Sequence, residues 1–251
     1  MTLLSIVVPV RNEESRLSAT LSALTVALAA TRESCEIVVV DNTSTDRSGE
    51  VAREHRFGSV PVRLIRCAQP GKGAAVRTGV LRTDSRYVGF CDADLATDMA
   101  ALAPTLRFLR TGVNVVVGSR AHPSSIVRAR HNQVRQAGAW AFRYAANTIV
   151  PGVGDTQCGY KFFDRHTADA IFRPLRTPGW AFDVELLARA QRIGAMIVEL
   201  PVSWRDVPGS TFRPMRDGYR SFAALARIRA ILGAEKTPAV TPAMTSVAEV
   251  A

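Results

Sequence analysis

The sequence predicts an α/β protein with one mostly parallel sheet flanked by helices. Short apolar runs alternate with segments whose leucines recur at helical spacing, and turn-forming residues follow most of the runs. Such alternation is typical of parallel strands joined by right-handed helical crossovers. The apolar runs lie at residues 3–10, 35–40, 62–66, 87–90, 113–118 and 196–204, and a short aromatic strand is expected within residues 155–164.

The helices follow from periodicity and from capping residues. Leucines at positions 17, 21, 24 and 28 predict a helix that extends to about residue 30. The polar run DNTSTD, residues 41–46, supplies turn residues and N-cap candidates for a helix through about residue 55. Further helices are expected at residues 74–81, 99–110, 133–150, 179–194 and 217–232.

Two segments lack this order. Residues 121–135 are polar and basic, and we expect a mobile loop there. Residues 233–251 show no apolar periodicity, which predicts a disordered tail. The folded part is therefore expected to be residues 1–232.

The composition is that of an ordinary soluble protein with a strong positive charge. Hydrophobic residues make up 47% of the chain, and no apolar run approaches the ~18–20 residues that span a bilayer. The N-terminus lacks the basic start of a secretion signal, so we expect a cytoplasmic protein whose first strand begins there. The net charge of +10, mostly from arginine, would attract nucleic acid, anionic membranes or phosphate-bearing substrates.

The four cysteines predict buried thiols. Cys35, Cys67, Cys91 and Cys158 are widely spaced, and no C-x-x-C pair is present. Because three of them adjoin or end predicted strands, burial is favoured over disulfides or zinc ligation.

Polar residues follow four of the predicted strands. They are residues 9–13, Asp41, Asp92 with Asp94, and residues 118–120. Ligands of parallel α/β sheets gather at the carboxyl ends of the strands. We therefore expect one site built from these four strand exits.

The central motif of that site is the D-x-D pair Asp92 and Asp94. Side chains alternate along a strand, so the two carboxylates can converge on one point. Mg²⁺ typically takes one or two carboxylates together with phosphate oxygens and water, which makes a metal–diphosphate the expected ligand. The alternative is a surface Asp pair that marks a turn.

The loop PGKGAA excludes two common nucleotide-binding motifs. Ala74 follows Gly73, so the chain has no G-x-x-x-x-G-K-[ST], and the third glycine of a dinucleotide fingerprint is absent. What remains is a loop with one lysine, Lys72.

Other polar residues leave two interpretations open. Asp41 could bind a base or ribose or cap a turn. Asp155 could be a catalytic or acceptor-facing acid or part of an ordinary connection. The arginines near the expected site could hold phosphate oxygens or form a solvated surface; these are Arg120, Arg128, Arg130 and Arg135.

Seven segments, in order, carry a family resemblance: SIVVPVRNEE, VVVDNTSTD, PGKGAAVRTG, FCDADLATD, VVGSR, DTQCGYKFF and WAFDVELL. Together they resemble the inverting nucleotide-sugar glycosyltransferases of family 2, over roughly residues 4–215. Within that family the chain is similar to the dolichyl-phosphate glucosyltransferases and polyprenyl-phosphate mannosyltransferases.

The resemblance implies a GT-A fold, with a mostly parallel Rossmann-like sheet flanked by helices. Residues 1–120 would form the nucleotide-sugar-binding half and residues 121–232 the acceptor half.

The resemblance also implies roles for individual residues. The base and ribose would be surrounded by Pro9, Arg11, Glu13 and Asp41, and Lys72 would lie close to the nucleotide. Asp92, Ala93 and Asp94 would contact the donor, with the two aspartates binding Mg²⁺ or Mn²⁺. Donor or acceptor phosphates would be held by Arg120, one of Arg128, Arg130 or Arg135, and Ser210 with Arg213. Asp155 would face the reacting centre.

The implied reaction transfers a hexose, from UDP-glucose, to polyprenyl phosphate with inversion. Asp94, Arg120 and Asp155 are the implied catalytic residues. GDP-mannose as donor and a soluble hydroxyl acceptor remain alternatives, and with a hydroxyl Asp155 would be the general base. The basic loop and the arginines of residues 216–227 predict a peripheral position on the inner face of a membrane.

The chain departs from the family pattern at three places. Ala96 stands where some relatives have a metal-binding glutamine, and Thr43 stands where the family usually has glycine. Many lipid-phosphate relatives also carry a transmembrane anchor, which this sequence lacks.

Two other functions compete. A sugar-phosphate nucleotidyltransferase would need a glycine- and arginine-rich loop after the first strand, which residues 11–15 do not provide. A basic nucleic-acid-binding protein would account for the charge, but the sequence contains no recognised nucleic-acid motif, and we expect no nucleic-acid partner.

Overall fold

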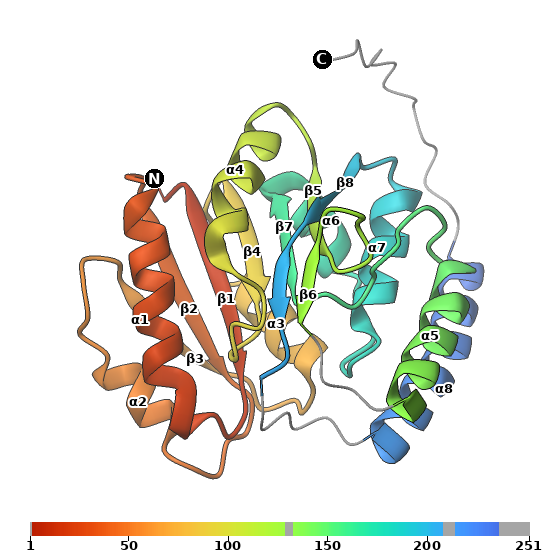
Figure 1. The fold of residues 1–251 in the computed structure, drawn as a ribbon, viewed down its shortest axis with the longest axis horizontal. Coiled ribbons are helices and arrows are strands. Elements are labelled where there is room, and N and C mark those ends of the chain that lie inside the picture. The colour runs from red at the N-terminus through yellow and green to blue at the C-terminus, as the bar shows by residue number, and fades with distance from the viewer. Residues whose placement is uncertain (1, 129–132, 208–213, 236–251) are drawn as a thin grey trace.

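A seven-stranded sheet with helices on both faces forms the centre of the computed structural model (Figure 1), which describes residues 2–128, 133–207 and 214–235. The side chains of residues 133–137, 214–217 and 219 are not among those described. The strands are β1 Leu4–Val10, β2 Cys35–Asp41, β3 Val62–Arg66, β4 Tyr87–Cys91, β5 Val115–Ser119, β6 Ile126–Arg128, β7 Tyr160–Asp164, β8 Ile197–Pro201 and β9 Ser203–Arg205. The helices are α1 Glu14–Ala30, α2 Ser48–Glu54, α3 Lys72–Val80, the 3₁₀ turn η1 Met99–Ala101, α4 Leu102–Arg110, α5 Gln133–Asn147, α6 Arg165–Phe172, α7 Phe182–Arg192 and α8 Pro214–Ala234.

The strand order confirms the predicted α/β class. The order in the sheet is β3-β2-β1-β4-β7-β5-β8, and all neighbours are parallel except at β7, which runs antiparallel to both β4 and β5. The carboxyl ends of β1, β2, β4 and β5 therefore meet at one edge of the sheet. Since β7 comes from the second part of the chain, both parts share one sheet.

Alternation along the strands divides the core into two layers. In β1, Leu4, Ile6 and Val8 pack with leucines of α1 and α4 on one face. Val7 points to the other face, where α3, α6 and α7 cover the sheet. Because both faces are covered, the strands read as continuous apolar runs in the sequence.

Three expected boundaries differ from the structure. The expected loop at residues 121–135 contains strand β6, which pairs in parallel with β9 in a separate small sheet. The single strand expected at residues 196–204 is divided into β8 and β9, because Val202 between them turns the chain from one sheet to the other. Helix α8 continues to Ala234, beyond the expected start of the tail, and residues 236–251 lie outside the described residues.

Two helices lie side by side at one end of the molecule. They are α5 and α8, whose Phe142 and Phe222 rings are 5.4 Å apart (Figure 1). Among the helices that the structure describes, none combines the length and apolar character needed to span a bilayer. All four cysteines are buried free thiols, as predicted.

Candidate active site

A pocket of about 1,100 Å³ lies at the sheet edge where the parallel strands end. Its lining includes most of the residues predicted for the nucleotide sugar and the reaction. Pro9, Arg11, Glu13, Lys72, Asp92, Ala93, Asp94 and Arg120 all line it. The structure therefore brings the exits of β1, β4 and β5 together with the loop before α3.

The lining of this pocket combines many basic side chains with a group of aspartates. Besides Lys72 and Arg120, the lining contains Arg11, Arg16, Arg176, Arg220 and Arg227. The acidic lining residues include Asp92, Asp94 and Asp183. Such a distribution suits a ligand that carries several phosphates, since guanidinium groups bind phosphate oxygens and carboxylates bind a counter-cation.

Several predicted residues lie elsewhere. Asp41 is not part of the lining, and its Oδ1 accepts a hydrogen bond from the Ser44 amide at 3.1 Å, which is the turn-capping role left open above. Thr43 adopts a φ of 58°, the left-handed region that favours glycine.

Arg128 is exposed at the end of β6 and is not part of the pocket lining. The side chains of Arg130, Arg135, Ser210 and Arg213 lie outside the described residues.

The two aspartates of D-x-D are presented by a tight turn after β4. The Asp92 amide donates to the Gly159 carbonyl at 3.2 Å, which extends the pairing with the segment before β7. Oδ1 of Asp94 accepts from the Ala96 amide at 3.0 Å, and Leu95 between them has a φ of 46°. Burial raises the pKa of Asp94, and the neighbouring charge of Asp92 adds to the increase.

Lys72 neutralises part of the charge of these aspartates. Its Nζ lies 2.6 Å from Oδ1 of Asp92, and only 11% of its side chain is exposed. Burial alone would lower the pKa of Lys72, but the charges of Asp92 and Asp183 outweigh it and raise the pKa. The ammonium also lies 5.3 Å from the centre of the Trp180 ring.

The two glycines that flank Lys72 are required by close packing. A Cβ on Gly71 would lie 2.2 Å from the Pro178 carbonyl oxygen, and Gly71 has a φ of 127°. A Cβ on Gly73 would lie 2.5 Å from Cβ of Phe182. The G-K-G sequence thus lets the start of α3 approach residues 177–182 closely, and this approach places Lys72 in the pocket.

Asn42 fixes the same loop from the other side. Its Oδ1 accepts from the Gly71 amide at 2.7 Å, and its Nδ2 donates to the Gln69 carbonyl at 2.7 Å. Asn42 is 3% exposed and lines the pocket. The sequence analysis missed this residue because a turn-forming amide directly after Asp41 gives no signal of a contact 29 residues away.

Arg120 and Asp155 form a bidentate ion pair. Arg120 Nε and Nη2 donate to the two carboxylate oxygens at 2.7 and 2.9 Å, and the Arg120 and Gln157 amides donate to them as well. Burial alone would raise the pKa of Asp155, but the hydrogen bonds and charge of Arg120 outweigh it and lower the pKa to about 2. Asp155 is 5% exposed and is not part of the pocket lining. Asp155 therefore holds the Arg120 guanidinium, and its expected position at the reacting centre stays a prediction.

A second buried pair joins Asp183 of the pocket lining to Lys161. Lys161 is fully buried, with its Nζ 2.7 Å from Oδ1 of Asp183. The contact is electrostatic, since that oxygen has no well-aligned hydrogen bond, whereas Nζ donates to the Cys158 carbonyl at 2.6 Å. Burial raises the pKa of Asp183, although Lys161 and Lys72 oppose the increase. No local pattern in the sequence pairs Asp183 with Lys161.

The chemistry of Asp92 and Asp94 fits a divalent cation. Both carboxylates line the same pocket, and a Cβ on Gly159 would lie 2.0 Å from Oδ2 of Asp92, so the backbone closes directly against this carboxylate. Among the described residues, no group of three or more His, Cys, Asp or Glu side chains forms a complete metal site. The pair therefore suits Mg²⁺ or Mn²⁺ only with further ligands from a phosphate-bearing substrate and water.

Comparisons with known proteins agree with this arrangement. The family model described as Glycosyl transferase family 2 matches residues 5–172. Dolichyl-phosphate beta-glucosyltransferase from Dictyostelium discoideum is 32% identical over 240 residues, which cover 90% of this chain and 73% of that protein. The protein of the same name from Homo sapiens is 34% identical over 226 residues, covering 84% of this chain and 70% of that protein.

A solved structure shares the fold at lower identity. Glucosyl-3-phosphoglycerate synthase from Mycobacterium tuberculosis, in complex with Mn²⁺, UDP-glucose and phosphoglyceric acid, superposes with a TM-score of 0.67 at 19% identity. The match covers 94% of this chain and 82% of that one.

Proposed function

Because the chain belongs to glycosyl transferase family 2, we propose that it transfers glucose from UDP-glucose to a polyprenyl phosphate, with inversion and with Mg²⁺ or Mn²⁺ as cofactor. The names of the curated relatives support the sugar and the lipid-phosphate acceptor. The observation that carries the proposal is the single pocket that Asp92, Asp94 and Arg120 line together.

The group of aspartates would receive the donor. A divalent cation held by Asp92 and Asp94 would neutralise the charge that develops on the departing diphosphate. Lys72, 2.6 Å from Asp92, is placed to add a second positive charge at the same phosphates. These charges favour the transition state because the leaving group becomes more negative as the glycosidic bond breaks.

The phosphate of the acceptor would bind the guanidinium of Arg120. A phosphate is already anionic at neutral pH, so it needs a cation to hold it near the diphosphate more than it needs a base. Asp155 fixes the guanidinium through two hydrogen bonds, and its pKa of about 2 makes it a poor proton acceptor. This pairing favours a phosphate acceptor over a hydroxyl acceptor, which would require a base.

The surface of α5 and α8 supports a peripheral membrane position on the cytoplasmic side. Trp140 and Tyr144 are 61% and 67% exposed and stack at 5.9 Å, and Phe222 of α8, whose ring contacts Phe142 of α5, is 41% exposed. Arg143 is exposed on the same helix as the first two. Exposed aromatic rings next to basic side chains are typical of segments that lie in the interface of an anionic membrane.

Two measurements test the proposal. Thermal unfolding is followed with UDP-glucose or GDP-mannose, each with and without Mn²⁺, because a ligand at 100 times its dissociation constant stabilises a fold by ~2.7 kcal/mol. We expect stabilisation by UDP-glucose with metal and formation of a lipid-linked glucose from polyprenyl phosphate. Stabilisation by GDP-mannose alone would assign the alternative donor, and turnover only with a hydroxyl acceptor would remove the lipid from the proposal.

A further inference from the structure

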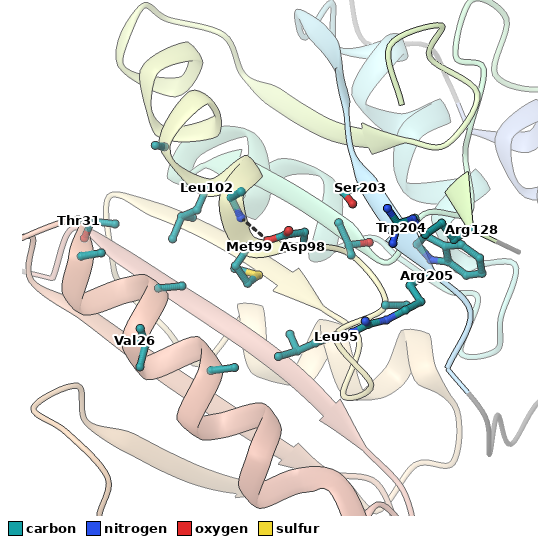
Figure 2. A pocket seen from close by; sticks show the side chains of 17 residues that line it. Val26, Thr31, Leu95, Asp98, Met99, Leu102, Arg128, Ser203, Trp204 and Arg205 are labelled. Atoms are coloured by element: carbon teal, nitrogen blue, oxygen red, sulfur yellow. Dashed lines mark hydrogen bonds between the residues drawn. The ribbon is translucent and has the colours of Figure 1, made fainter. Parts of the chain in front are cut away.

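A second hollow of about 800 Å³ lies beside the candidate active site, and no role has been assigned to it above. One wall is the outer face of α1, with Val26 and Thr31, and a second is the segment from Leu95 to Leu102. The far end is formed by Arg128 of β6 and by β9 (Figure 2). Its volume lies within the ~300–1,000 Å³ of ordinary small-molecule sites. We call it the α1–β9 groove.

The walls of the α1–β9 groove are mainly aliphatic. Val26 is 59% exposed, and Leu95 and Met99 are half-buried, with their side chains at the groove. The α1 wall is otherwise made of alanines, which leave the space between the helix and β9 open. Exposed apolar side chains gathered around a hollow favour an apolar ligand.

The groove adjoins the candidate active site. Ala96 and Trp204 line both hollows. The turn after β4 also faces both, since Asp94 lines the pocket while Leu95, one residue on, lines the groove. Leu95 has a φ of 46°, and a non-glycine residue in this strained region is typical of ligand-contacting segments.

Cations lie next to Trp204, a residue that lines both hollows. Arg128 and Arg205 are paired in register between β6 and β9, and both line the groove beside Trp204 (Figure 2). On the pocket side, the Arg120 guanidinium lies 5.5 Å from the centre of the Trp204 ring. A ligand with an anionic head and an apolar chain would therefore find cations at the junction and aliphatic walls beyond it.

We propose that the α1–β9 groove binds the first isoprene units of the acceptor lipid, with the lipid phosphate at the junction near Arg120. This inference rests on the proposed function, because it takes the acceptor to be a polyprenyl phosphate. The shared residue Trp204, the charge of Arg128 and Arg205 and the predominance of aliphatic side chains in the lining favour this occupant over a second sugar or a nucleotide.

The test measures acceptor binding directly. Farnesyl phosphate and isopentenyl phosphate, which share the head group but differ in chain length, are titrated into the protein calorimetrically with UDP present. Ala27→Trp fills the α1 wall, and Val26→Glu places a charge on an exposed position of it. Ala29→Trp is the matched control, because Ala29 is exposed on the same helix but does not line the groove.

We expect both groove variants to weaken farnesyl phosphate binding at least tenfold, with isopentenyl phosphate and UDP-glucose affinities unchanged. Ala29→Trp should bind all three ligands like the wild type. Equal farnesyl phosphate affinity in all four proteins, or no preference of the wild type for the longer chain, would overturn the proposal. Failure of the proposed function is distinct from this result: the wild type would then bind farnesyl phosphate through the groove and yet transfer no sugar to it.

Discussion

The ammonium of Lys72 lies 2.6 Å from Oδ1 of Asp92, so one of the two carboxylates proposed to bind a metal ion already carries a cation from the protein itself. The helix start that places Lys72 there depends on Gly71 and Gly73 and on the close approach of residues 177–182. A metal ion that enters without nucleotide would therefore have to share Asp92 with this lysine.

We expect Lys72→Met to change metal and donor binding in opposite directions. Removal of the competing charge should tighten binding of Mn²⁺ alone by ~tenfold, which corresponds to ~1.4 kcal/mol. Binding of UDP-glucose with Mn²⁺ should weaken, because the variant loses a cation beside the diphosphate. Titration calorimetry with each ligand checks both effects, and a weaker Mn²⁺ affinity without nucleotide would contradict the competition.

Asp155 should make stability depend on pH in the acid range. Its pKa is lowered from an ordinary value of about 3.9 to about 2, so it adds stability above pH ~4 that is lost as the pH falls toward 2. The shift corresponds to about 2–3 kcal/mol of unfolding free energy. Urea unfolding of the wild type and Asp155→Asn should show a gap at pH 7 that shrinks between about pH 4 and pH 2. A gap that stays constant over this range would show that the ion pair with Arg120 does not contribute.

Gly159→Ala should disturb Asp92 without a long-range effect on the fold. The new Cβ would lie 2.0 Å from Oδ2 of Asp92, so the carboxylate must move. Overpacking of this kind typically costs about 1–3 kcal/mol, and donor binding should weaken with it. Gly154→Ala is the control in the same segment, because its Cβ would meet nothing closer than 3.4 Å. Equal UDP-glucose affinity of the two variants, measured by calorimetry with Mn²⁺, would argue against this role for Gly159.

The buried pair Lys161 and Asp183 should behave as one unit. Lys161→Met leaves a buried carboxylate without its partner, which typically costs about 3–5 kcal/mol. Adding Asp183→Leu should recover much of that loss, since an apolar pair of similar size avoids burying charge. Urea denaturation of the two single variants and the double variant measures the coupling. Additive losses would mean that the two residues stabilise the fold independently.

The strands of the sheet could be predicted where burial on both faces requires a continuous run of apolar residues. Strands β1, β2 and β5 are covered on both faces, so their continuous apolar runs identify them. Their order in space was less accessible, because β7 pairs with β4 across more than 70 residues and no local pattern encodes that partner. Helix α6 was missed, although its N-cap Asp164, which accepts from the Thr167 amide at 2.9 Å, is an ordinary helix-start signal.

Site residues at the ends of strands could be predicted from the sequence, whereas contacts between residues far apart in the chain could not. Arg11, Asp92 and Arg120 directly follow parallel strands, so the sheet alone brings them to one pocket. Asp155 shows the limit of that reasoning. Its motif left a reactive acid and an ordinary connection both open, and no local pattern indicated its partner Arg120, 35 residues earlier in the chain.

The insertion of β7 between β4 and β5 affects how the chain can acquire its structure during synthesis. When residue 119 has left the ribosome, β4 and β5 are both present, yet neither has the neighbour that will join them. Their edges stay open until residue 164 emerges, and unpaired strand edges readily associate with other chains. The nascent polypeptide therefore passes through a window of about 45 residues in which chaperone binding would be most useful, and a fragment that ends at residue 120 should aggregate when expressed alone.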